Sequence, residues 1–382
     1  MSENMKIMMN SGRIGVFFST RLKLVEAVKE QGYNVTIGGY EQENKHLCEE
    51  QGLQFAYIPL SRAGINPFAD LKTIRLYEKI MKEEKFDIVH SYTAKPNIYG
   101  SIAAKHAGIT KIYPTVNGLG YAFTDEGYTG VKTKLVRIIS LLLYKWAFAC
   151  ATKVFFQNPD DANEMVRRGV VSPEKCVVID GSGVDLEKFA FSEPHVHPMH
   201  FLMATRLLVS KGVRTFLEAA KVVKKQYPEV QFSLAGSFDL NPDGINKSEL
   251  NTYIEEGIVR YLGHTENMLT EYTNCSVFVL PSYYREGVPR SVLEAMSTGR
   301  AIITCNTPGC KETVYHVDKS GRGENGFLIQ PKDVHQLVEK MIWMIQNPGQ
   351  VKQMGMKSRK YAENRFDVHK VNSQILKEMG IS

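Results

Sequence analysis

Residues 282–299 read SYYREGVPRSVLEAMSTG and follow the apolar run VFVL at 277–280. That run is long enough for one buried strand, and Pro281 closes it. Beyond Pro289 the apolar side chains return at helical spacing until Gly299, where a C-terminal glycine cap is expected. The stretch therefore predicts a strand, a loop and the start of a helix, the arrangement found at the carboxyl edge of a parallel sheet.

The same stretch carries groups that suit a ligand with two kinds of polar atom. Free backbone amides at a helix start point towards solvent and favour phosphate. Two carboxylates, Glu286 and Glu294, flank these amides with seven residues between them. Because like charges repel, carboxylates cannot help to bind phosphate, so a ligand that meets both must also carry hydroxyls. A nucleotide sugar fits this description.

Strands and helices alternate along the whole chain, which is typical of α/β proteins with parallel sheets. The strands expected in the first half lie at residues 6–9, 35–37, 55–58, 88–89, 112–116, 154–156 and 177–179. Those expected in the second half lie at residues 201–203, 232–235, 259–262, 277–280 and 302–303. The glycine-containing loop at 10–15 lacks GxGxxG order, so a dinucleotide fingerprint is not supported.

We therefore predict an α/β chain with two tandem Rossmann-like, doubly wound domains that face a central cleft. The first is expected over residues 1–191 and the second over 199–365. Residues 192–198, SEPHVHP, have no periodicity and are interpreted as a linker. A C-terminal helix is expected over 366–382. This helix either stays with the second domain or crosses back to the first domain. A ligand between two such domains is the default expectation.

Composition and charge exclude several classes of protein. The chain has 382 residues, of which 43% are hydrophobic and 23% charged, as in ordinary soluble globular proteins. Its six cysteines are scattered without a CxxC pair, so we expect reduced cysteines and no metal site. No apolar stretch of about 18 residues and no signal-peptide core occur, so we expect a cytoplasmic protein without a membrane span. The net charge of +6 is modest, so the distribution of the charge matters more than its total. We expect no nucleic-acid partner and no cofactor.

Residues 131–151 form an unusual candidate helix. Its apolar stripe consists of Leu135, Ile138, Ile139, Leu142 and Leu143. The side chains around this stripe are Lys132, Lys134, Arg137, Lys145 and Trp146. A basic amphipathic helix with an interfacial tryptophan suits the surface of an anionic membrane. The alternative is a core-packing helix with a solvated basic face, and both interpretations fit the sequence.

Ordered motifs in both halves give the chain a family resemblance. In the second half they are RLLVSKG at 206–212, Ala235-Gly236, and Glu286-Gly287-Val288-Pro289 followed by Glu294. In the first half they are VNGLGY at 116–121, FQN at 156–158 and GVD at 183–185. Together they resemble the retaining glycosyltransferases of family 4, which have the two-domain GT-B fold. The resemblance implies an acceptor-binding first domain and a second domain that binds a nucleotide sugar.

The resemblance also implies a role for each motif residue. Arg206 and Lys211 would hold the donor diphosphate and stabilise the charge on the leaving nucleotide, which requires no metal. Glu286 would accept hydrogen bonds from the transferred sugar, so these three residues form the expected catalytic set. The other expected donor-binding residues are Gly15, Asn117, Gly236, Leu262, His264, Gly287, Val288, Pro289 and Glu294. Among them, the resemblance places Glu294 at the ribose and Leu262 with His264 at the base.

Asn117 departs from the family pattern, because many members have a histidine there that contacts the donor sugar. Asparagine can donate and accept a hydrogen bond but carries no charge, so the departure puts the identity of the sugar in doubt. The family has no agreed protein nucleophile, so the resemblance implies front-face attack, with a phosphate oxygen accepting the acceptor proton. Taken alone, the charged motif residues would be interpreted as solvated surface groups, and His264 as structural.

Residues 61–67 and 90–97 resemble those of bacterial enzymes that extend polyprenyl-diphosphate-linked sugars in capsule, surface-polysaccharide or N-glycan assembly. The resemblance implies a UDP-linked hexose or N-acetylhexosamine as donor and a lipid-linked glycan as acceptor. Arg62 and Lys95 would meet the lipid diphosphate, and His90 is either an acceptor-side base or a buried strand-end histidine. The basic amphipathic helix would then rest on the inner face of the cell membrane.

Two other functions are compatible with the same fold. A sugar-nucleotide epimerase would need acid and base side chains in its cleft, and the order Arg206, Lys211, Glu286, Glu294 does not suit it. A nucleotide-sugar-binding module without transfer activity is disfavoured, because all four of these residues are intact.

Overall fold

A computed structural model describes residues 5–60, 67–120, 123, 131–239, 241, 243–265 and 267–381 of the chain. The chain divides into two compact units, Met1–Ser182 with His369–Ser382, and Gly183–Val368. Residues 192–198, expected as a linker, lie within the second unit.

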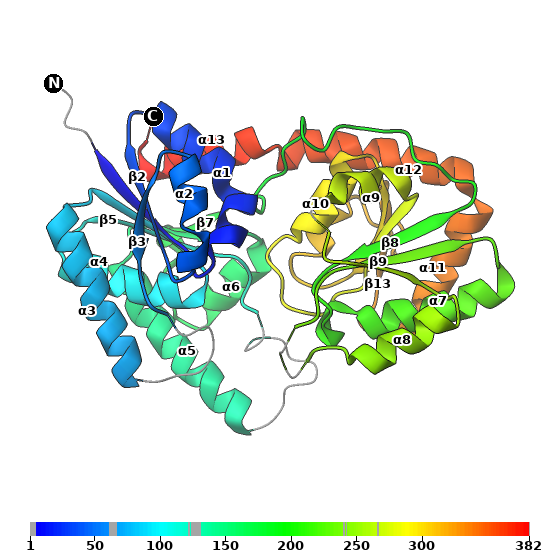
Figure 1. The fold of residues 1–382 in the computed structure, drawn as a ribbon, viewed down its shortest axis with the longest axis horizontal. Coiled ribbons are helices and arrows are strands. Elements are labelled where there is room, and N and C mark those ends of the chain that lie inside the picture. Colours follow the sequence, from blue (N-terminus) through cyan, green and yellow to red (C-terminus); the bar gives the residue numbers. More distant parts are fainter. Residues whose placement is uncertain are drawn as a thin grey trace. The chain divides into compact units, whose positions relative to one another are not determined.

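The described part of the first unit contains a seven-stranded parallel sheet with the strand order β3-β2-β1-β4-β5-β6-β7 (Figure 1). Its strands are β1 (Lys6–Asn10), β2 (Asn34–Gly39), β3 (Gln54–Tyr57), β4 (Ile88–Tyr92), β5 (Lys111–Val116), β6 (Val154–Phe156) and β7 (Cys176–Val178). Its helices are α1 (Ile14–Glu30), α2 (His46–Glu50), α3 (Pro67–Glu84), α4 (Ser101–His106), α5 (Val131–Cys150), α6 (Pro159–Arg167) and α13 (Val368–Met379). Figure 1 shows α3, α4 and α5 on one side of this sheet and α1, α2 and α13 on the other.

The central strands of this sheet are buried on both faces, which explains their continuous apolar sequences. β1 lies between β2 and β4, with Met8 opposite Thr36 on one side and Val89 on the other. Met8 belongs to the core that includes residues of α3, α4 and α5. Its neighbour Ile7 belongs to the core that includes residues of α1 and α13. Successive side chains of one strand thus support two separate cores.

The C-terminal helix α13 packs against the first unit. Its apolar residues Val371, Ile375 and Met379 belong to the same core as β1. The Tyr113 hydroxyl of β5 also donates a hydrogen bond to Met379 O at 3.2 Å. The last helix of the chain is therefore part of the unit that contains the first strand.

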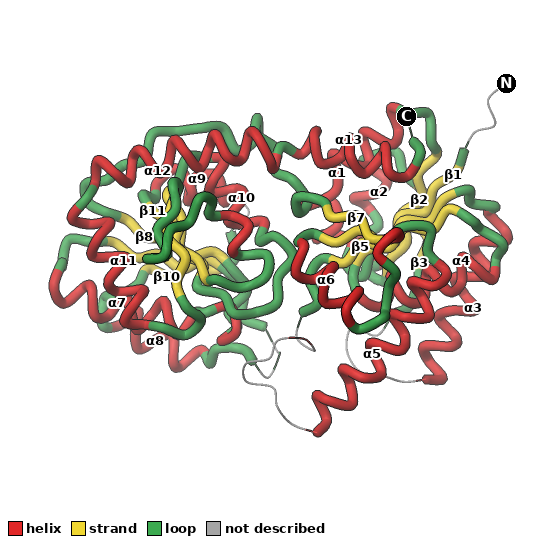
Figure 2. The backbone as a smooth tube through the Cα atoms, turned by 180° about the vertical axis from the view of Figure 1, so that it is seen from behind, coloured by secondary structure: helices red, strands yellow, loops and turns green. Residues whose placement is uncertain are grey.

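The described part of the second unit contains a six-stranded parallel sheet with the strand order β10-β9-β8-β11-β12-β13. Its strands are β8 (His200–Ala204), β9 (Gln231–Ala235), β10 (Arg260–Gly263), β11 (Val277–Leu280), β12 (Ala301–Cys305) and β13 (Gly326–Ile329). Its helices are α7 (Val213–Gln226), α8 (Lys247–Glu255), α9 (Met268–Asn274), α10 (Arg290–Ser297), α11 (Val334–Gln346) and α12 (Pro348–Tyr361). Figure 2 shows these helices around the strands of the sheet.

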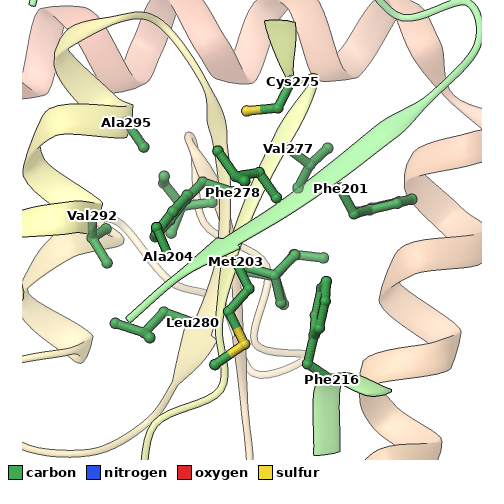
Figure 3. Packing of buried hydrophobic residues seen from close by; sticks show 14 of the residues in the cluster. Phe201, Met203, Ala204, Phe216, Cys275, Val277, Phe278, Leu280, Val292 and Ala295 are labelled. Atoms are coloured by element: carbon green, nitrogen blue, oxygen red, sulfur yellow. The ribbon is translucent and has the colours of Figure 1, made fainter. Parts of the chain in front are cut away.

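The core of the second unit forms where strands β8 and β11 meet the helices on either side (Figure 3). Phe201 and Phe278 come from the two strands, Phe216 from α7 and Val292 from α10, and all four are buried. Complete burial of such a side chain contributes about 1.5–3 kcal/mol to folding. These contacts fix the strands whose carboxyl ends carry the predicted motif residues.

The strand order reverses between β1 and β4 in the first sheet and between β8 and β11 in the second. At such a point the chains that leave two neighbouring strands diverge to opposite faces and leave a crevice at the carboxyl edge. The loop after β8 carries Arg206 and Lys211, and the loop after β11 carries Glu286. The predicted α/β architecture with two doubly wound sheets is thus confirmed, and it brings the three residues of the expected catalytic set to one sheet edge.

Two details differ from the sequence analysis. β13 was not predicted, because its sequence GFLI begins with Gly326 and glycine is depleted in strands. A Cβ on Gly326 would lie 1.9 Å from Ile302 O, so glycine allows this strand to pair closely with β12. The expected loop at 10–15 is shorter, since α1 begins at Ile14 and Gly15 lies in its first turn.

None of the described helices is both long and apolar enough to cross a membrane.

Candidate active site

The loop after β8 is shaped by a left-handed glycine. Gly212 has φ +81° and directly precedes α7. A Cβ on Gly212 would lie 2.1 Å from Pro281 O, so the loops after β8 and β11 approach each other at backbone distance. The amides of Tyr283 and Tyr284 donate to Ser210 O, each at 2.9 Å, and join the two loops.

Lys211 and Glu286, one from each of these loops, form an ion pair. Their side chains are only 10% and 13% exposed. Ser282 Oγ donates to Glu286 Oε1 at 3.1 Å, and the Tyr284 ring centroid lies 4.8 Å from Lys211 Nζ. Partners on several sides hold both charged groups in place. The cation expected at the diphosphate and the carboxylate expected at the sugar are thus adjacent.

Arg206 lies on the same loop as Lys211, closer to β8. Its side chain is 43% exposed, and its Nη1 is 3.1 Å from Asp239 Oδ2. Asp239 follows β9, the strand next to β8, and the sequence analysis did not identify it. A guanidinium has five N–H donors, so Arg206 can bind phosphate oxygens while it keeps this partner.

A cavity of about 200 Å³ lies at the carboxyl ends of β8, β9 and β10. Its lining residues are Ala204, Thr205, Ala235, Gly236, His264, Thr265, Met268, Tyr272, Ser291 and Glu294. Position 236 requires glycine, because its φ is +144° and a Cβ would lie 1.8 Å from Thr205 O. The structure thus brings three predicted donor-binding residues, Gly236, His264 and Glu294, to one cavity.

Glu294 is held at this cavity by two hydrogen-bond donors. The Tyr272 hydroxyl donates to Oε2 at 3.0 Å, and Arg290 Nε donates to Oε1 at 2.7 Å. Burial raises the pKa of Tyr272 well above its usual value, and the charge of Glu294 raises it further, so the phenol stays protonated. Each carboxylate oxygen has a second acceptor position that a hydroxyl can use.

Gly287, Val288 and Pro289 are buried directly before α10. A Cβ on Gly309 would lie 1.4 Å from Gly287 O, so the loop after β12 packs directly on this segment. Leu262, expected at the base, packs against the hydrophobic core of the unit and is not among the residues that line the cavity. The role of Leu262 therefore stays a prediction.

In the first unit, the amide of Gly15 has a partner within the protein. It donates to Glu41 Oε2 at 3.2 Å, and Arg13 Nε and Asn44 Nδ2 each donate to the same carboxylate at 2.9 Å. Burial raises the pKa of Glu41, but these hydrogen bonds and the charge of Arg13 outweigh it and keep the pKa below its usual value. Gly15 thus anchors the start of α1 to the loop after β2, and its donor contact stays a prediction.

Asn117 follows β5 and is exposed. Its Oδ1 accepts hydrogen bonds from Arg21 Nη2 and Gln157 Nε2, both at 3.2 Å. The sequence analysis did not identify Arg21, which is buried on α1. Its signal was its spacing, because Arg21 lies on the same buried face as Phe17 and Leu24, where a charged residue is unusual.

His90 is completely buried on β4. Its Nε2 lies 2.8 Å from Thr115 Oγ1, and its Nδ1 lies 3.1 Å from the Tyr92 hydroxyl. Burial, together with the charge of Arg21, lowers the pKa of His90 to about 3, so the ring is neutral. Of the two interpretations of this residue, these contacts favour the buried strand-end histidine.

The other acceptor-side residues lie nearer the surface or outside the described chain. Lys95 Nζ is 3.2 Å from Asp70 Oδ1 on α3, and both side chains are less than one-fifth exposed. Arg62 lies outside the described residues. Within the described ranges, no group of three or more His, Cys, Asp or Glu side chains is placed to hold a metal ion.

Comparison with known proteins identifies the family. Residues 186–361 match the family model described as glycosyl transferases group 1, and residues 14–158 match the model described as glycosyl transferase 4-like. The N,N'-diacetylbacillosaminyl-diphospho-undecaprenol alpha-1,3-N-acetylgalactosaminyltransferase of Campylobacter jejuni is 31% identical over 340 residues, with 86% of each chain covered. The chain belongs to the glycosyltransferases.

This glycosyltransferase is also similar to two other bacterial enzymes. The UDP-Gal:alpha-D-GlcNAc-diphosphoundecaprenol alpha-1,3-galactosyltransferase of Escherichia coli is 28% identical over 321 residues, with 78% of each chain covered. The capsular polysaccharide biosynthesis glycosyltransferase CapM of Staphylococcus aureus is 27% identical over 370 residues, covering 93% of this chain and 90% of CapM.

Solved structures have the same fold as this glycosyltransferase. HepE from Anabaena, in complex with UDP and glucose, has a TM-score of 0.76 at 18% identity, covering 98% of this chain and 99% of HepE. Sucrose-phosphate synthase from Thermosynechococcus elongatus has a TM-score of 0.77 at 18% identity, with 98% of each chain covered. The predicted GT-B fold is confirmed.

Proposed function

We propose that this glycosyltransferase moves a hexose or an N-acetylhexosamine from a UDP-linked donor to a polyprenyl-diphosphate-linked glycan. The product would serve surface-polysaccharide or glycoprotein glycan assembly. The observation that carries the proposal is the set of charged groups at the carboxyl edge of the second sheet. Lys211 and Glu286 are paired there, and Glu294 borders a cavity at the same edge.

The two cations explain how the donor bond would break. An ammonium group has three donors, so Lys211 can bind a phosphate oxygen while it keeps Glu286 as a partner. When the anomeric carbon separates from the diphosphate oxygen, the electron pair stays on the diphosphate. Arg206 and Lys211 then meet more negative charge than in the bound donor, and this difference lowers the barrier. The scheme needs no metal ion.

Retention of the anomeric configuration is part of the proposal, and its support is the family's pattern of two glutamates. An acceptor hydroxyl that attacks on the side of the leaving group would lie near a phosphate oxygen, which would take its proton. Glu286 and Glu294 would bind hydroxyls of the sugar and the ribose. Neither carboxylate is assigned as a nucleophile or a general acid.

The relatives support the choice of donor and acceptor. The E. coli enzyme is named for UDP-galactose, and the Anabaena structure contains UDP. Both the C. jejuni and the E. coli enzymes act, by name, on sugars linked to undecaprenyl diphosphate. In this chain, Lys95 and Arg62 would meet the lipid diphosphate, and Lys95 would exchange its partner Asp70 for phosphate.

We propose that the protein binds peripherally to the anionic cytoplasmic face of the cell membrane. The exposed side chains of helix α5 support this position. Leu135, Ile138, Leu142 and Trp146 recur at helical spacing, and their side chains are between 50% and 64% exposed. Phe148, on another face of the helix, is buried in the core. α5 therefore packs on the core with one face and presents a second apolar face to its surroundings.

The exposed apolar row of α5 differs from the predicted stripe in its members. Ile139 and Leu143 are half-buried, whereas Trp146 belongs to the exposed row. Lys134 and Lys145 are exposed on the same helix. Each basic side chain near an anionic surface adds about 1 kcal/mol of attraction, which supplements the apolar contact.

Transfer of radiolabelled sugar from UDP-, GDP- and ADP-linked donors to an undecaprenyl-diphosphate-linked sugar tests the function. We expect transfer from UDP-sugars, with a loss of about 100-fold or more in Arg206→Ala and Glu286→Ala. Arg260→Ala, which removes an exposed arginine paired with Glu271, serves as the control and should keep full activity. Interconversion of UDP-sugars without transfer would instead identify an epimerase, and undiminished transfer in both site variants would refute the site.

A further inference from the structure

The segment between β9 and α8 packs against the loop after β8, which carries Arg206 and Lys211. The structure describes residues 237–239, 241 and 243–246 of this segment. The amide of Leu207 donates to Ser237 O at 3.1 Å, and the amide of Ile245 donates to Leu207 O at 2.9 Å. The loop with both expected phosphate-binding cations is thus joined to a second segment of the same unit by backbone hydrogen bonds.

Asp243 makes three contacts with two neighbouring residues of this loop. Its Oδ2 accepts hydrogen bonds from the amide of Ser210, at 3.1 Å, and from the Ser210 hydroxyl. Its backbone oxygen accepts from the amide of Val209 at 2.8 Å. Val209 and Ser210 form a short 3-10 turn together with Lys211. Asp243 therefore holds two of the three residues of this turn, and the third residue carries the ammonium group.

Ser210 connects Asp243 with the loop that carries Glu286. The residue is 1% exposed, and its carbonyl oxygen accepts from the amides of Tyr283 and Tyr284. Its side chain and its own amide are used by Asp243. Ser210 thus has a partner in the segment after β9 and partners in the loop after β11. Its position decides where the side chain of Lys211 starts relative to Glu286.

The same segment also reaches Arg206. Asp239 Oδ2 accepts from Arg206 Nη1, and Asp239 Oδ1 accepts from the amide of Asn241 at 3.0 Å. Asn241 Oδ1 in turn accepts from the amide of Asp243 at 3.0 Å. A Cβ on Gly244 would lie 2.5 Å from Asp239 O, so these turns are closely packed. A continuous chain of hydrogen bonds thus runs from Arg206 to Asp243.

A carboxylate close to a bound diphosphate repels it, so neither Asp239 nor Asp243 suits direct contact with the donor. We propose that Asp243 is a positioning residue for Lys211. It holds the turn of Val209, Ser210 and Lys211 in the shape that places the ammonium group for the leaving diphosphate before the donor binds. The inference rests on the proposed transferase function and deepens it, because it names a residue that acts on the reaction through Lys211.

Asp243→Ala removes the side-chain partner of Ser210 and keeps the backbone contact with Val209. We expect kcat to fall by about 10- to 100-fold, because a misplaced ammonium group stabilises the leaving diphosphate poorly. The KM for the donor should rise less, since Lys211 meets more negative charge in the transition state than in the bound donor. Asp243→Asn keeps an oxygen for the amide of Ser210 and should restore most of the kcat.

A double substitution separates positioning from a merely structural role. Lys211→Ala by itself should lower kcat by about 100-fold. Addition of Asp243→Ala to Lys211→Ala should lower kcat by less than about threefold further, because the group through which Asp243 acts is already missing. A residue that only stabilises the fold would lower the melting temperature and leave the kcat of the folded enzyme unchanged. An equal factor of loss in the presence and absence of Lys211 overturns the inference.

Asp318→Ala is the matched control in the same unit. Asp318 Oδ1 also accepts from the amide and the hydroxyl of one serine, Ser320, at 2.8 and 2.7 Å. Asp318 is not among the residues that line the cavity with Glu294. The control should therefore leave kcat and KM unchanged, whatever its effect on the melting temperature.

The measurements use the full chain, the UDP-sugar that the wild type transfers, and an undecaprenyl-diphosphate-linked acceptor. If a melting curve shows that Asp243→Ala does not fold, Ser210→Ala, which removes only the hydroxyl partner of Asp243, takes its place in every comparison. Wild-type kcat in the folded variant overturns the inference and leaves the transferase function intact. Absence of transfer by the wild type from any nucleotide sugar overturns the function and the inference together.

Discussion

The charged side chains of the proposed donor site are each oriented by a residue from another segment of the chain. Glu286 is paired with Lys211 from the loop after β8, and Glu294 accepts from Tyr272 of α9. A carboxylate with such a partner has fewer rotamers available than a free one. Its orientation is therefore fixed before a ligand binds, which reduces the entropy that binding costs.

Tyr272→Phe should weaken the donor site without affecting the reacting bond. The change removes the hydroxyl that donates to Glu294 Oε2 at 3.0 Å. Loss of this hydrogen bond costs about 1 kcal/mol, so we expect the KM for the UDP-sugar to rise about fivefold. The kcat should change less, because the proposed partner of Glu294 is the ribose. Steady-state kinetics with varied donor concentration measures both constants.

Tyr227→Phe is the matched control for this change. The Tyr227 hydroxyl accepts a hydrogen bond from Gln346 near the end of α7, away from the cavity residues. It should leave the donor KM unchanged. An unchanged KM in Tyr272→Phe would show that Tyr272 does not orient Glu294 for the donor.

His90 should make the stability of the protein depend on pH. Folding lowers its pKa to about 3, whereas an unfolded chain takes up this proton near pH 6.5. Between these values the unfolded state binds one more proton, so stability is lost as the pH falls below about 6.5. The slope is about 1.4 kcal/mol per pH unit, or about 2 kcal/mol between pH 6.5 and 5.

His90→Gln, which cannot be protonated, isolates this contribution. Urea denaturation of the wild type and the variant at about pH 7.5 and pH 5 gives four free energies of unfolding. The wild type should lose about 2 kcal/mol more than the variant on acidification, whatever the cost of the substitution itself. Equal losses in the two proteins would show that His90 is not held neutral in the fold.

Helix α5 shows how one element can serve two environments. A helix with a single apolar stripe buries that stripe in the core. α5 has Tyr144 and Phe148 in the core and a second row, Leu135, Ile138 and Leu142, that stays exposed. This second row explains why the sequence was compatible both with a core helix and with a membrane-surface helix.

Replacement of Leu135, Ile138, Leu142 and Trp146 by serine should weaken binding to vesicles that contain phosphatidylglycerol. Each apolar side chain that enters the membrane interface contributes free energy in proportion to its buried area. We expect the partition coefficient to fall by at least about tenfold in co-sedimentation. The fold should be kept, because these side chains are exposed in the structure.

Val222→Ser with Met356→Ser provides the control, since both residues are exposed apolar side chains of the second unit. This control should bind vesicles like the wild type. Unchanged binding of the α5 variant would exclude its exposed row as the membrane contact.

Among the described residues, the two units of the chain share no hydrophobic core, since two core clusters lie in the first unit and one in the second. The first unit includes the C-terminal helix, whose Ile375 packs with strands and helices from the opposite end of the sequence. Leu337 of α11 belongs to the core of the second unit. Although α13 is distant in sequence from β1, it is as much a part of this core of the first unit as α1 is.

Ile375→Ala and Leu337→Ala should therefore destabilise different parts of the chain. Each substitution leaves a cavity in a closed core and costs about 2–5 kcal/mol. In hydrogen exchange, Ile375→Ala should expose amides of β1 and β5 more than those of β8 and β11, and Leu337→Ala should do the reverse. The same exchange pattern in both variants would contradict the division into two units with separate cores.

Much of this architecture was predictable from local patterns. Short runs of two to five residues, most of them apolar, marked most of the strands, and Gly299, expected at the end of a helix, follows α10 with φ +87°. Gly236 and Glu294 were expected at the donor, and both line the same cavity. β13 was not predicted, since its sequence GFLI begins with glycine, a residue that is depleted in strands.

The sequence by itself determined the alternation of strands and helices and the placement of Glu286 and Glu294 around a helix start, because both depend on residues close along the chain. Only the tertiary structure decided that Lys211 pairs with Glu286, that Tyr272 holds Glu294, and that Arg21 reaches Asn117. These contacts join residues that are far apart in the sequence and are brought together by the order of the strands in each sheet and by the helices that pack on it. The order of those strands is fixed by core packing over the whole unit, and no local pattern records it.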